Sequence, residues 1–164
     1  KLFVSTNKAA NFYATTSSLP VAPENFGRGG GGGGVLAATT GMEGDLWAGL
    51  RGGGLYHSTD GGVSFSKLNT IDGVEALGFG KAAPGKDFPA IFLLGTIHQL
   101  HARFRSDDAG RTWVRIDDDQ HQYANADVPL IIGDPRIYGR VYFTTGGRGV
   151  IYGDIKNEPA FSKE

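Results

Sequence analysis

The chain has 164 residues, of which 27 are Gly and 7 are Pro, while 40 % are hydrophobic. This hydrophobic share argues against general disorder, and the glycines lack the every-third-residue period of collagen, so they indicate many tight turns between short strands. With 16 basic and 17 acidic residues the net charge is −1, so the chain lacks the positive field that attracts nucleic acid.

Short apolar segments bounded by turn residues follow one another along the whole chain. None extends into a helical pattern over ten or more residues, so we predict an all-β chain with almost no helix. Aromatic and β-branched residues flanked by Gly, Asp and Asn are typical of strands and hairpins. The predicted strands are 2–5, 12–15, 35–38, 46–48, 54–58, 64–68, 91–94, 101–106, 112–116, 130–133, 141–145 and 150–154.

One motif recurs between these strands. Residues Ser58–Phe65 (STDGGVSF) and Ser106–Trp113 (SDDAGRTW) both fit S-x-D-x-G-x-x-[FW], an Asp box, and begin 48 residues apart. A decayed copy, Ser5–Phe12, begins 53 residues before the first. A period near 50 residues that holds four short strands is the signature of a propeller blade.

The repeat predicts a β-propeller with four-stranded antiparallel blades, of which about three are present. Because propellers close with four to eight blades, we expect a part of a larger propeller. The repeat predicts two strands before the Gly run, four in each complete blade and three in the last, thirteen in all. The predicted divisions are 1–28 (end of one blade), 29–34 (Gly run), 35–70 and 71–119 (complete blades), 120–155 (incomplete last blade) and 156–164 (tail).

We expect a structural role for the Asp boxes. Their Ser and Asp side chains can accept hydrogen bonds from turn N–H groups, Gly can adopt positive φ, and the aromatic residue can bury between sheets. This interpretation is favoured over catalysis or metal binding. The residues concerned are Ser58, Asp60, Gly62, Phe65, Ser106, Asp108, Gly110 and Trp113.

Trp47, Leu55 and Tyr56 recur as Phe143, Ile151 and Tyr152 when two periods of 48 residues are added. For Trp47, Tyr56 and Tyr152 this equivalence favours packing in the core over stacking on a sugar.

Several further stretches together resemble the C-terminal part of glycoside hydrolase family 74, the xyloglucanases and related oligoxyloglucan-releasing enzymes. The Asp boxes alone would fit sialidases or sortilin-type receptors equally well, and Gly133–Tyr142 (GDPRIYGRVY) sharpens the assignment. The stretches are 43–49, 54–62, 78–86, 105–113, 117–123, 133–142 and 147–154.

This resemblance implies two seven-bladed propellers around a cleft, and inverting hydrolysis of the β-1,4-glucan backbone of xyloglucan by two Asp residues. In the family each propeller supplies one of them, near its own start. Neither catalytic motif maps onto this chain, so no catalytic residue is assigned, and the segment is expected to form propeller wall and cleft. The resemblance further implies secretion, with xyloglucan or a related β-glucan, the remainder of the propeller and an N-terminal propeller domain as partners.

Two alternatives stay open: a non-catalytic propeller that binds carbohydrate or protein, and an inactive excised fragment. Two stretches depart from the family, residues 97–104 and the run Gly29–Gly34. For the Gly run we keep three interpretations, namely a flexible insertion, an engineered joint, or positions of unassigned identity written as Gly.

Aromatic residues in loops between blades are the candidates for substrate binding. Tyr123 and Tyr138 lie in such loops, where exposed rings could stack on a glucan chain. The pair Asp134 and Arg136 fits a structural turn better than a sugar contact.

We expect no cofactor and no metal. His98, His101 and His121 fit surface or loop-anchoring roles, and 117–119 (DDD) fits a solvated turn better than a calcium loop. The absence of Cys excludes a disulfide framework, a Cys-ligated zinc site and thiol catalysis. No apolar run approaches the roughly 18 residues that cross a bilayer, so no membrane partner is expected. Nucleic acid is not expected as a partner either, because the net charge is −1.

Overall fold

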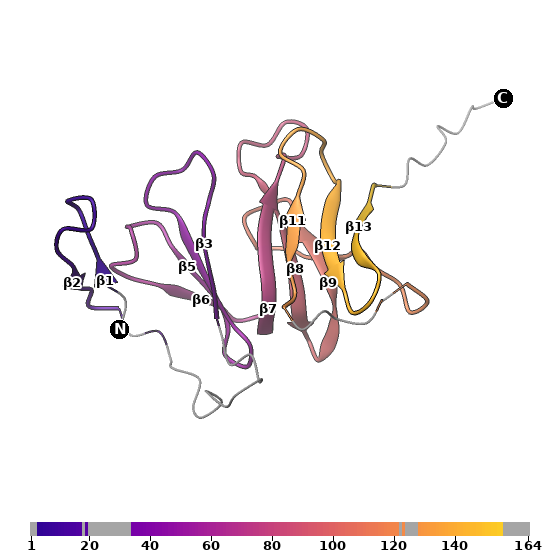
Figure 1. Cartoon of the computed structure of the whole chain (residues 1–164), viewed down its shortest axis with the longest axis horizontal. Helices are drawn as coiled ribbons and strands as arrows, with labels where there is room; N and C mark the ends of the chain where they lie inside the picture. Colours follow the sequence, from indigo (N-terminus) through magenta and orange to yellow (C-terminus); the bar gives the residue numbers. More distant parts are fainter. Residues whose placement is uncertain (1–2, 18, 20–33, 122, 124–127, 156–164) are drawn as a thin grey trace.

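The computed structural model describes residues 3–17, 19, 34–121, 123 and 128–155. Over these residues the chain forms thirteen strands and no helix. The described part therefore contains no helix that could cross a membrane. The strands form four antiparallel sheets that follow one another along the chain and stand side by side in space (Figure 1).

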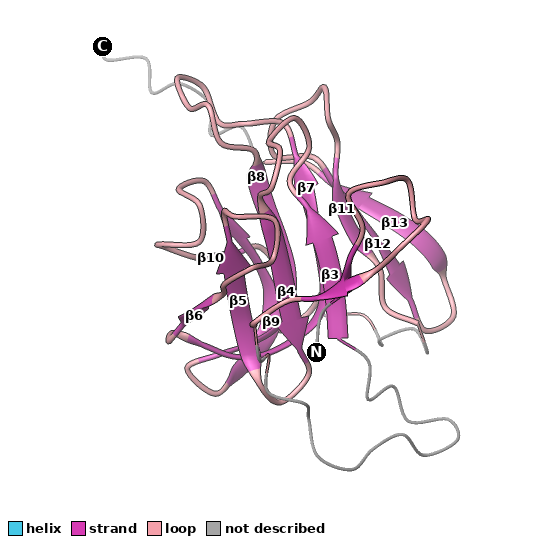
Figure 2. Cartoon of the chain, turned by 90° about the vertical axis from the view of Figure 1, so that its left-hand side faces the viewer, coloured by secondary structure: helices cyan, strands magenta, loops and turns pink. Residues whose placement is uncertain are grey.

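Each sheet is a meander in which strands pair with their neighbours in sequence (Figure 2). The first sheet contains β1 (Phe3–Val4) and β2 (Tyr13–Ala14). The second contains β3 (Gly34–Ala38), β4 (Leu46–Leu50), β5 (Gly54–Ser58) and β6 (Ser66–Leu68). The third contains β7 (Ile71–Gly80), β8 (Ala90–Ile97), β9 (Leu100–Ser106) and β10 (Val114–Arg115). The fourth contains β11 (Ile131–Gly133), β12 (Val141–Thr145) and β13 (Gly149–Gly153).

The all-β class and the four-stranded antiparallel blades are therefore confirmed. Strand β7 is the first of the four strands predicted for 71–119. Its pairing with β8 shifts register between Ile71 and Gly73 and again between Val74 and Ala76. Each shift adds a residue to one strand, and this breaks the alternation of apolar and polar residues by which a strand is recognised. Of the Gly run, 29–33 lies outside the described residues, while Gly34 opens β3.

The third sheet is buried on both faces. Ile91 and Leu93 of β8 belong to the core shared with the second sheet, while Phe92 and Leu94 belong to the core shared with the fourth. Because successive side chains of a strand point to opposite faces, a strand between two sheets is apolar without interruption. This explains the run IFLL in the sequence.

Glycines allow the innermost strands of the third and fourth sheets to approach closely. A Cβ added at Gly78 would lie 2.9 Å from Ile132 Cα and closer still to the carbonyl oxygen of Ile131. A Cβ at Gly80 would lie 2.8 Å from Gly133 Cα. The two backbones therefore pack without side chains between them at these positions.

The prediction of core packing is confirmed for Trp47, which is 0 % exposed, and wrong for Tyr152, which is 63 % exposed. Leu50 pairs with Gly54 at the β4–β5 turn and Thr145 with Gly149 at the β12–β13 turn, so the two hairpins correspond at an offset of 95 residues rather than 96. A shift of one residue moves a side chain to the other face of a sheet. Tyr152 therefore corresponds to His57.

Tyr56, the third residue of that prediction, is only partly buried, and the Lys67 ammonium lies 5.9 Å from the centre of its ring. Tyr56 is absent from both core clusters of buried residues and from the partly buried residues packed against them.

Candidate functional site

The first Asp box closes the β5–β6 turn with a local hydrogen-bond network. Ser58 Oγ donates to Asp60 Oδ1 (2.7 Å) and accepts from the backbone N–H of Gly62 (2.9 Å). Asp60 Oδ1 accepts from the backbone N–H of Ser64 (2.9 Å), and Asp60 Oδ2 accepts from Ser64 Oγ (2.6 Å). Gly61 and Gly62 both have positive φ, at 73° and 87°. One serine and one aspartate thereby bond the N–H groups of a turn that glycine makes possible.

The second box repeats this network, with Gly110 N–H bonding to Ser106 Oγ (2.9 Å) and Thr112 N–H to Asp108 Oδ1 (2.8 Å). Its aromatic residue, Trp113, donates from Nε1 to the carbonyl oxygen of Gly110 (3.0 Å) and packs against the core shared by the second and third sheets. Phe65, the aromatic residue of the first box, is partly buried.

The decayed copy near the N-terminus keeps the same geometry. Ala9 N–H bonds to Ser5 Oγ (2.8 Å), and Asn11 N–H bonds to Asn7 Oδ1 (2.9 Å). Lys8 and Ala9 have φ of 57° and 65°, where the first box has glycines. The turn has therefore kept its conformation after losing the residues that adopt it most easily.

Hydrogen bonds hold the box carboxylates in their charged form. The pKa of Asp60 is lowered from 3.8 to about 2, chiefly by the hydroxyl of Ser64. Burial acts to raise the pKa of Asp108, but hydrogen bonds from Thr112 and Ser106 lower it on balance. A carboxylate whose oxygens are already engaged in this way is a poor proton donor.

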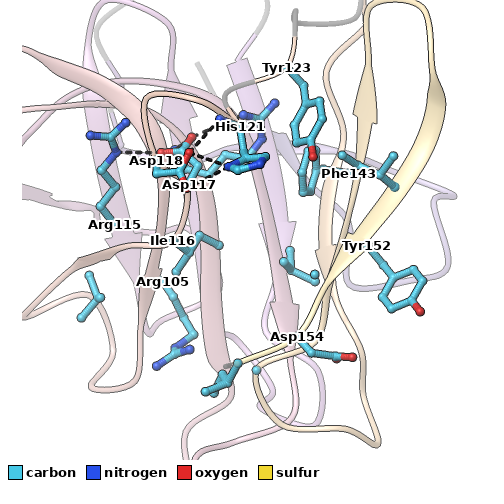
Figure 3. Close-up of a pocket in the computed structure, with 17 residues that line it drawn as sticks. Arg105, Arg115, Ile116, Asp117, Asp118, His121, Tyr123, Phe143, Tyr152 and Asp154 are labelled. Atoms are coloured by element: carbon cyan, nitrogen blue, oxygen red, sulfur yellow. Dashed lines mark hydrogen bonds and ion pairs between the residues drawn. The ribbon is translucent and has the colours of Figure 1, made fainter. Parts of the chain in front are cut away.

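A cavity of about 590 Å³ lies between the outer strands of the third sheet and strands β12 and β13 of the fourth (Figure 3). Asp117 forms its charged centre. Asp117 Oδ2 accepts from the backbone N–H of Arg103 (3.0 Å), and Asp117 Oδ1 accepts from Arg115 Nε (2.8 Å). The Asp117 side chain is only 4 % exposed, so the prediction of a solvated turn is wrong for Asp117, whereas Asp118 and Asp119 are exposed.

Arg103 explains why a carboxylate is buried there. Its guanidinium lies 4.2 Å from the centre of the Phe143 ring, and its Nη1 is 3.4 Å from Asp117 Oδ2. Burial lowers the pKa of Arg103, and Asp117 acts in the opposite direction. The pair links the third sheet to the fourth through a stacked cation and its counter-ion.

Tyr123 stands at the edge of this cavity and of a second one of about 610 Å³. Its ring centre is 6.1 Å from that of Phe143 and 6.3 Å from that of His121, and the Arg148 guanidinium lies 5.9 Å from it. Its φ of 49° is uncommon outside glycine. The second cavity is lined by Gln120, His121, Tyr123, Thr145, Gly146, Gly147 and Arg148.

Tyr138, the other predicted sugar-stacking residue, lines neither of these two cavities. Its hydroxyl donates to Asp107 Oδ2 (2.9 Å), the Arg105 guanidinium lies 5.3 Å from its ring centre, and it packs against the core between the third and fourth sheets. Burial, together with Asp107, raises the pKa of Tyr138. The structure does not bring the two tyrosines together in one site.

The Asp134 carboxylate organises the loop before β12. It accepts from the backbone N–H groups of Arg136 (2.7 Å) and Ile137 (3.0 Å) and from the Tyr142 hydroxyl (2.9 Å), and these bonds lower its pKa. The predicted structural turn is therefore confirmed. Arg136 contributes its backbone N–H to that turn.

The three predicted surface histidines are all exposed. His101 Nε2 lies 3.1 Å from Glu75 Oε1, and His121 Nδ1 lies 2.8 Å from Asp118 Oδ1. His98 and Gln99 form the two-residue β8–β9 turn with φ of 50° and 65°, values that such turns usually reach with Asn-Gly. Within the stretch 97–104, which departs from the family, residues 98–99 are thus a tight turn built without glycine, and 100–104 belong to β9.

One buried network escaped the sequence analysis. Asp45 Oδ1 accepts from Trp47 Nε1 (2.9 Å) and from the Thr39 hydroxyl, while Asp45 Oδ2 lies 2.8 Å from His57 Nε2. The His57 ring stacks on Trp47 with centres 4.0 Å apart. Asp45 directly precedes β4, and Trp47 lies within it. Their spacing of two residues puts both side chains on one face, and this spacing is the feature of the sequence that indicates the network.

Hydrogen bonds lower the pKa of five aspartates in the described part of the chain. Asp60, Asp108, Asp118, Asp134 and Asp154 all have a lowered pKa, in each case through hydrogen bonds that favour the charged form. The general acid of a glycosidase needs the opposite, a carboxyl group with a raised pKa. None of these five residues has the property of a general acid.

Comparison with known proteins gives relatives along almost the whole chain. No family model matches. A xyloglucanase from a Paenibacillus species is 46 % identical over 160 residues, which cover 94 % of this chain and 14 % of that protein. A xyloglucanase from Acetivibrio thermocellus is also 46 % identical over 160 residues, covering 97 % of this chain and 18 % of that protein. The chain therefore spans less than a fifth of the length of either relative.

A solved structure shares the fold. The crystal structure of a GH74 enzyme from Niastella koreensis superposes with a TM-score of 0.80 at 34 % identity, over 96 % of this chain and 22 % of that chain.

Proposed function

The chain is a segment of a glycoside hydrolase family 74 protein, and from this premise we propose that the parent protein hydrolyses the β-1,4-glucan backbone of xyloglucan. The observation that carries the proposal is 46 % identity to two xyloglucanases over nearly the whole chain. The fold agrees, since the described sheets match a GH74 structure at a TM-score of 0.80.

Within that parent, the segment builds propeller wall beside the substrate and leaves bond cleavage to residues elsewhere. Inverting hydrolysis needs one carboxylic acid to protonate the leaving oxygen and one carboxylate to activate water, about 6.5–9.5 Å apart. The five aspartates with lowered pKa are bound to hydroxyl, N–H or guanidinium groups and are suited to fixing loops. We place the catalytic pair in the part of the parent outside this chain.

The experiment is hydrolysis of xyloglucan by the full-length parent, followed by proton NMR of the anomeric signals. Inversion of a β-linked glucan releases the α-anomer first, before mutarotation mixes the two forms. Release of the β-anomer first would contradict the inverting mechanism. A folded parent that binds xyloglucan without cleaving it would favour the alternative of a non-catalytic carbohydrate-binding propeller.

Tyr123 is our candidate for contact with the glucan chain. Its ring borders both cavities, and the side chains of Gln120 and Arg148 nearby carry N–H donors suited to sugar hydroxyls. A neutral polysaccharide needs such stacking and hydrogen bonding rather than charge, in keeping with a net charge of −1. Contact between Tyr138 and the substrate stays a prediction. The Tyr138 hydroxyl already donates to Asp107.

Steady-state kinetics of two variants test this assignment. In the parent, Tyr123→Ala is expected to raise KM for xyloglucan about 3–10-fold with little change in kcat, because it removes a stacking surface present before and during reaction. Tyr123→Phe keeps the ring and should retain a KM close to that of the unaltered protein. Equal KM values for all three proteins would remove Tyr123 from the binding surface.

We further propose that the parent acts outside the cell, where a xyloglucan-degrading enzyme meets its polymer. Fractionation of culture medium and cells that express the parent with its natural N-terminus tests this. Xyloglucan-hydrolysing activity confined to the cells would contradict it.

A further inference from the structure

The two register shifts of β7 each place an acidic residue against the β8–β9 hairpin. Each shift leaves one residue of β7 without a partner on β8, and these residues are Asp72 and Glu75. A bulge re-aims the side chain of its extra residue, and bulges are frequent beside functional sites. Asp72 Oδ2 accepts from the backbone N–H of Gln99 (2.9 Å), and Glu75 Oε1 lies 3.1 Å from His101 Nε2. Two carboxylates of β7 therefore hold the hairpin that carries His101.

His101 projects from the face of β9 that is turned toward the fourth sheet and Tyr123. His101 and Arg103 are two residues apart on β9, so their side chains leave the same face. The Arg103 guanidinium lies 4.2 Å from the centre of the Phe143 ring, and the Tyr123 ring centre lies 6.1 Å from that of Phe143. At about 3.3 Å per residue, His101 follows Arg103 on this face by about 7 Å along the strand.

The β8–β9 turn and the β12–β13 turn lie at the same end of their sheets, the lower end in Figure 1. The Cβ positions of Gly78 and Gly80 on β7 approach successive residues of β11, so β7 and β11 run in the same direction. Their antiparallel partners β8 and β12 then both end where β7 begins. The cavity of about 610 Å³ beside Tyr123 is lined by residues of the β12–β13 turn. His101 and this cavity therefore open toward the same side of the molecule.

His101 is accessible although its blade has a neighbour on each side. The His101 side chain is 45 % exposed and that of Glu75 is 19 % exposed. The second and fourth sheets already pack against the two faces of the third sheet. The exposure of His101 is therefore a feature of that end of the blade.

Glu75 determines what the His101 ring can bind. A carboxylate only accepts hydrogen bonds, so the neutral ring carries its proton on Nε2, which faces Glu75, and its Nδ1 is an acceptor. Among the described residues, Nδ1 has no hydrogen-bond partner. A sugar hydroxyl is a donor that suits this atom, and the Tyr123 ring on the same side supplies a surface for stacking.

We propose that His101 is a substrate-binding residue, whose Nδ1 accepts a hydrogen bond from a hydroxyl of xyloglucan, and that Glu75 is its positioning residue. The inference rests on the proposed action of the parent on xyloglucan. His101 lies within the stretch 97–104, which departs from the family, so the contact is one that this protein adds to the family pattern.

Steady-state kinetics of the full-length parent on xyloglucan test the contact. His101→Phe keeps a planar ring without an acceptor and is expected to raise KM about 2–10-fold with little change in kcat, because one hydrogen bond to the substrate is lost. Arg111→Ala is the matched control and should keep the native KM, since Arg111 is exposed in the second Asp box, at the opposite end of the third sheet. His101→Ala gives the same comparison if His101→Phe lowers the melting temperature.

An unbranched β-1,4-glucan, assayed in parallel, identifies the hydroxyl. A raised KM on both substrates places it on the glucan backbone, and a raised KM on xyloglucan alone places it on a side branch. Both outcomes support the contact.

The positioning role of Glu75 has its own readout. Glu75→Ala should raise KM, whereas Glu75→Gln should restore most of the loss, because its amide oxygen can still accept from Nε2–H. Adding Glu75→Ala to His101→Phe should raise KM no further, since both changes remove one interaction. Increases that multiply in the double variant would contradict a role of Glu75 through His101.

A native KM in both His101 variants, or an equal rise in Arg111→Ala, would overturn the proposal. Activity of the unaltered parent separates this proposal from that of the enzyme. Hydrolysis with a native KM in both His101 variants refutes the contact alone. If the parent is retarded in a gel that contains xyloglucan but does not cleave it, weaker retardation of His101→Phe supports the contact and refutes the enzyme proposal alone.

Discussion

The close approach of the third and fourth sheets at Gly78 provides a sensitive test of how the blades pack. In Gly78→Ala, the new methyl group would lie 2.9 Å from Ile132 Cα and 3.1 Å from the Ile131 carbonyl carbon. Both are backbone atoms, which cannot rotate away as a flexible side chain can. The two strands must separate, and overpacking of this kind costs about 1–3 kcal/mol.

Gly52→Ala is the matched control. Gly52 has no neighbouring atom within 4 Å of an added Cβ and has no positive φ, so the same substitution meets no obstacle there. Gly78→Ala should therefore lower the melting temperature, by less per kcal/mol than the roughly 2–4 °C of a domain of 150–250 residues, because the parent is larger. Gly52→Ala should leave it unchanged or raise it slightly.

The assay is thermal unfolding of the full-length parent, with both variants and the unaltered protein measured side by side. Equal melting temperatures for Gly78→Ala and Gly52→Ala would refute the backbone contact between β7 and β11, and with it the blade spacing described above.

Three further predictions concern charges and turns. Asp117→Ala should lower the free energy of unfolding by about 3–5 kcal/mol in urea, because it removes the buried carboxylate that bonds the Arg103 guanidinium. Asp119→Ala, at a side chain 85 % exposed, should change it by less than about 0.5 kcal/mol, and similar losses would refute the buried pair. Since the pKa of Asp60 falls from 3.8 to about 2 on folding, its stabilisation is complete above pH 3.8 and lost as the pH drops through about 2. The melting temperature of Asp60→Asn should therefore fall less between pH 4 and pH 2 than that of the unaltered protein, and parallel curves would contradict the assignment. Replacing the β8–β9 turn by Asn-Gly (His98→Asn with Gln99→Gly) should stabilise the protein by about 1 kcal/mol by relieving two positive φ angles, and a lower melting temperature would count against this account of the turn.

The sequence was sufficient for the blades where an Asp box marked them. The boxes fix the ends of third strands and the starts of fourth strands, because the motif closes its turn by local hydrogen bonds that need no information from the rest of the fold. Strand β7 was predicted by the strand count of the repeat, but its bounds were not, because its two register shifts interrupt the alternation of a regular strand.

The side-chain environments were harder to predict. The prediction for Tyr152 was wrong because a repeat aligned one residue out assigns every side chain to the opposite face. The burial of Asp117 was missed because its partners, Arg103 and Arg115, come from a strand pair that only folding brings around it. Likewise, the contacts of Tyr123 with Phe143 and Arg148 join a loop to a distant hairpin.

The most direct test of the central claim is the release of new reducing ends from xyloglucan by the full-length parent and by the 164-residue chain alone. If the segment forms wall in a family 74 hydrolase, the parent should release reducing ends steadily and the chain alone should release none. A folded parent without activity would contradict the proposed enzyme. Turnover by the isolated chain would show that the catalytic carboxylates lie within it.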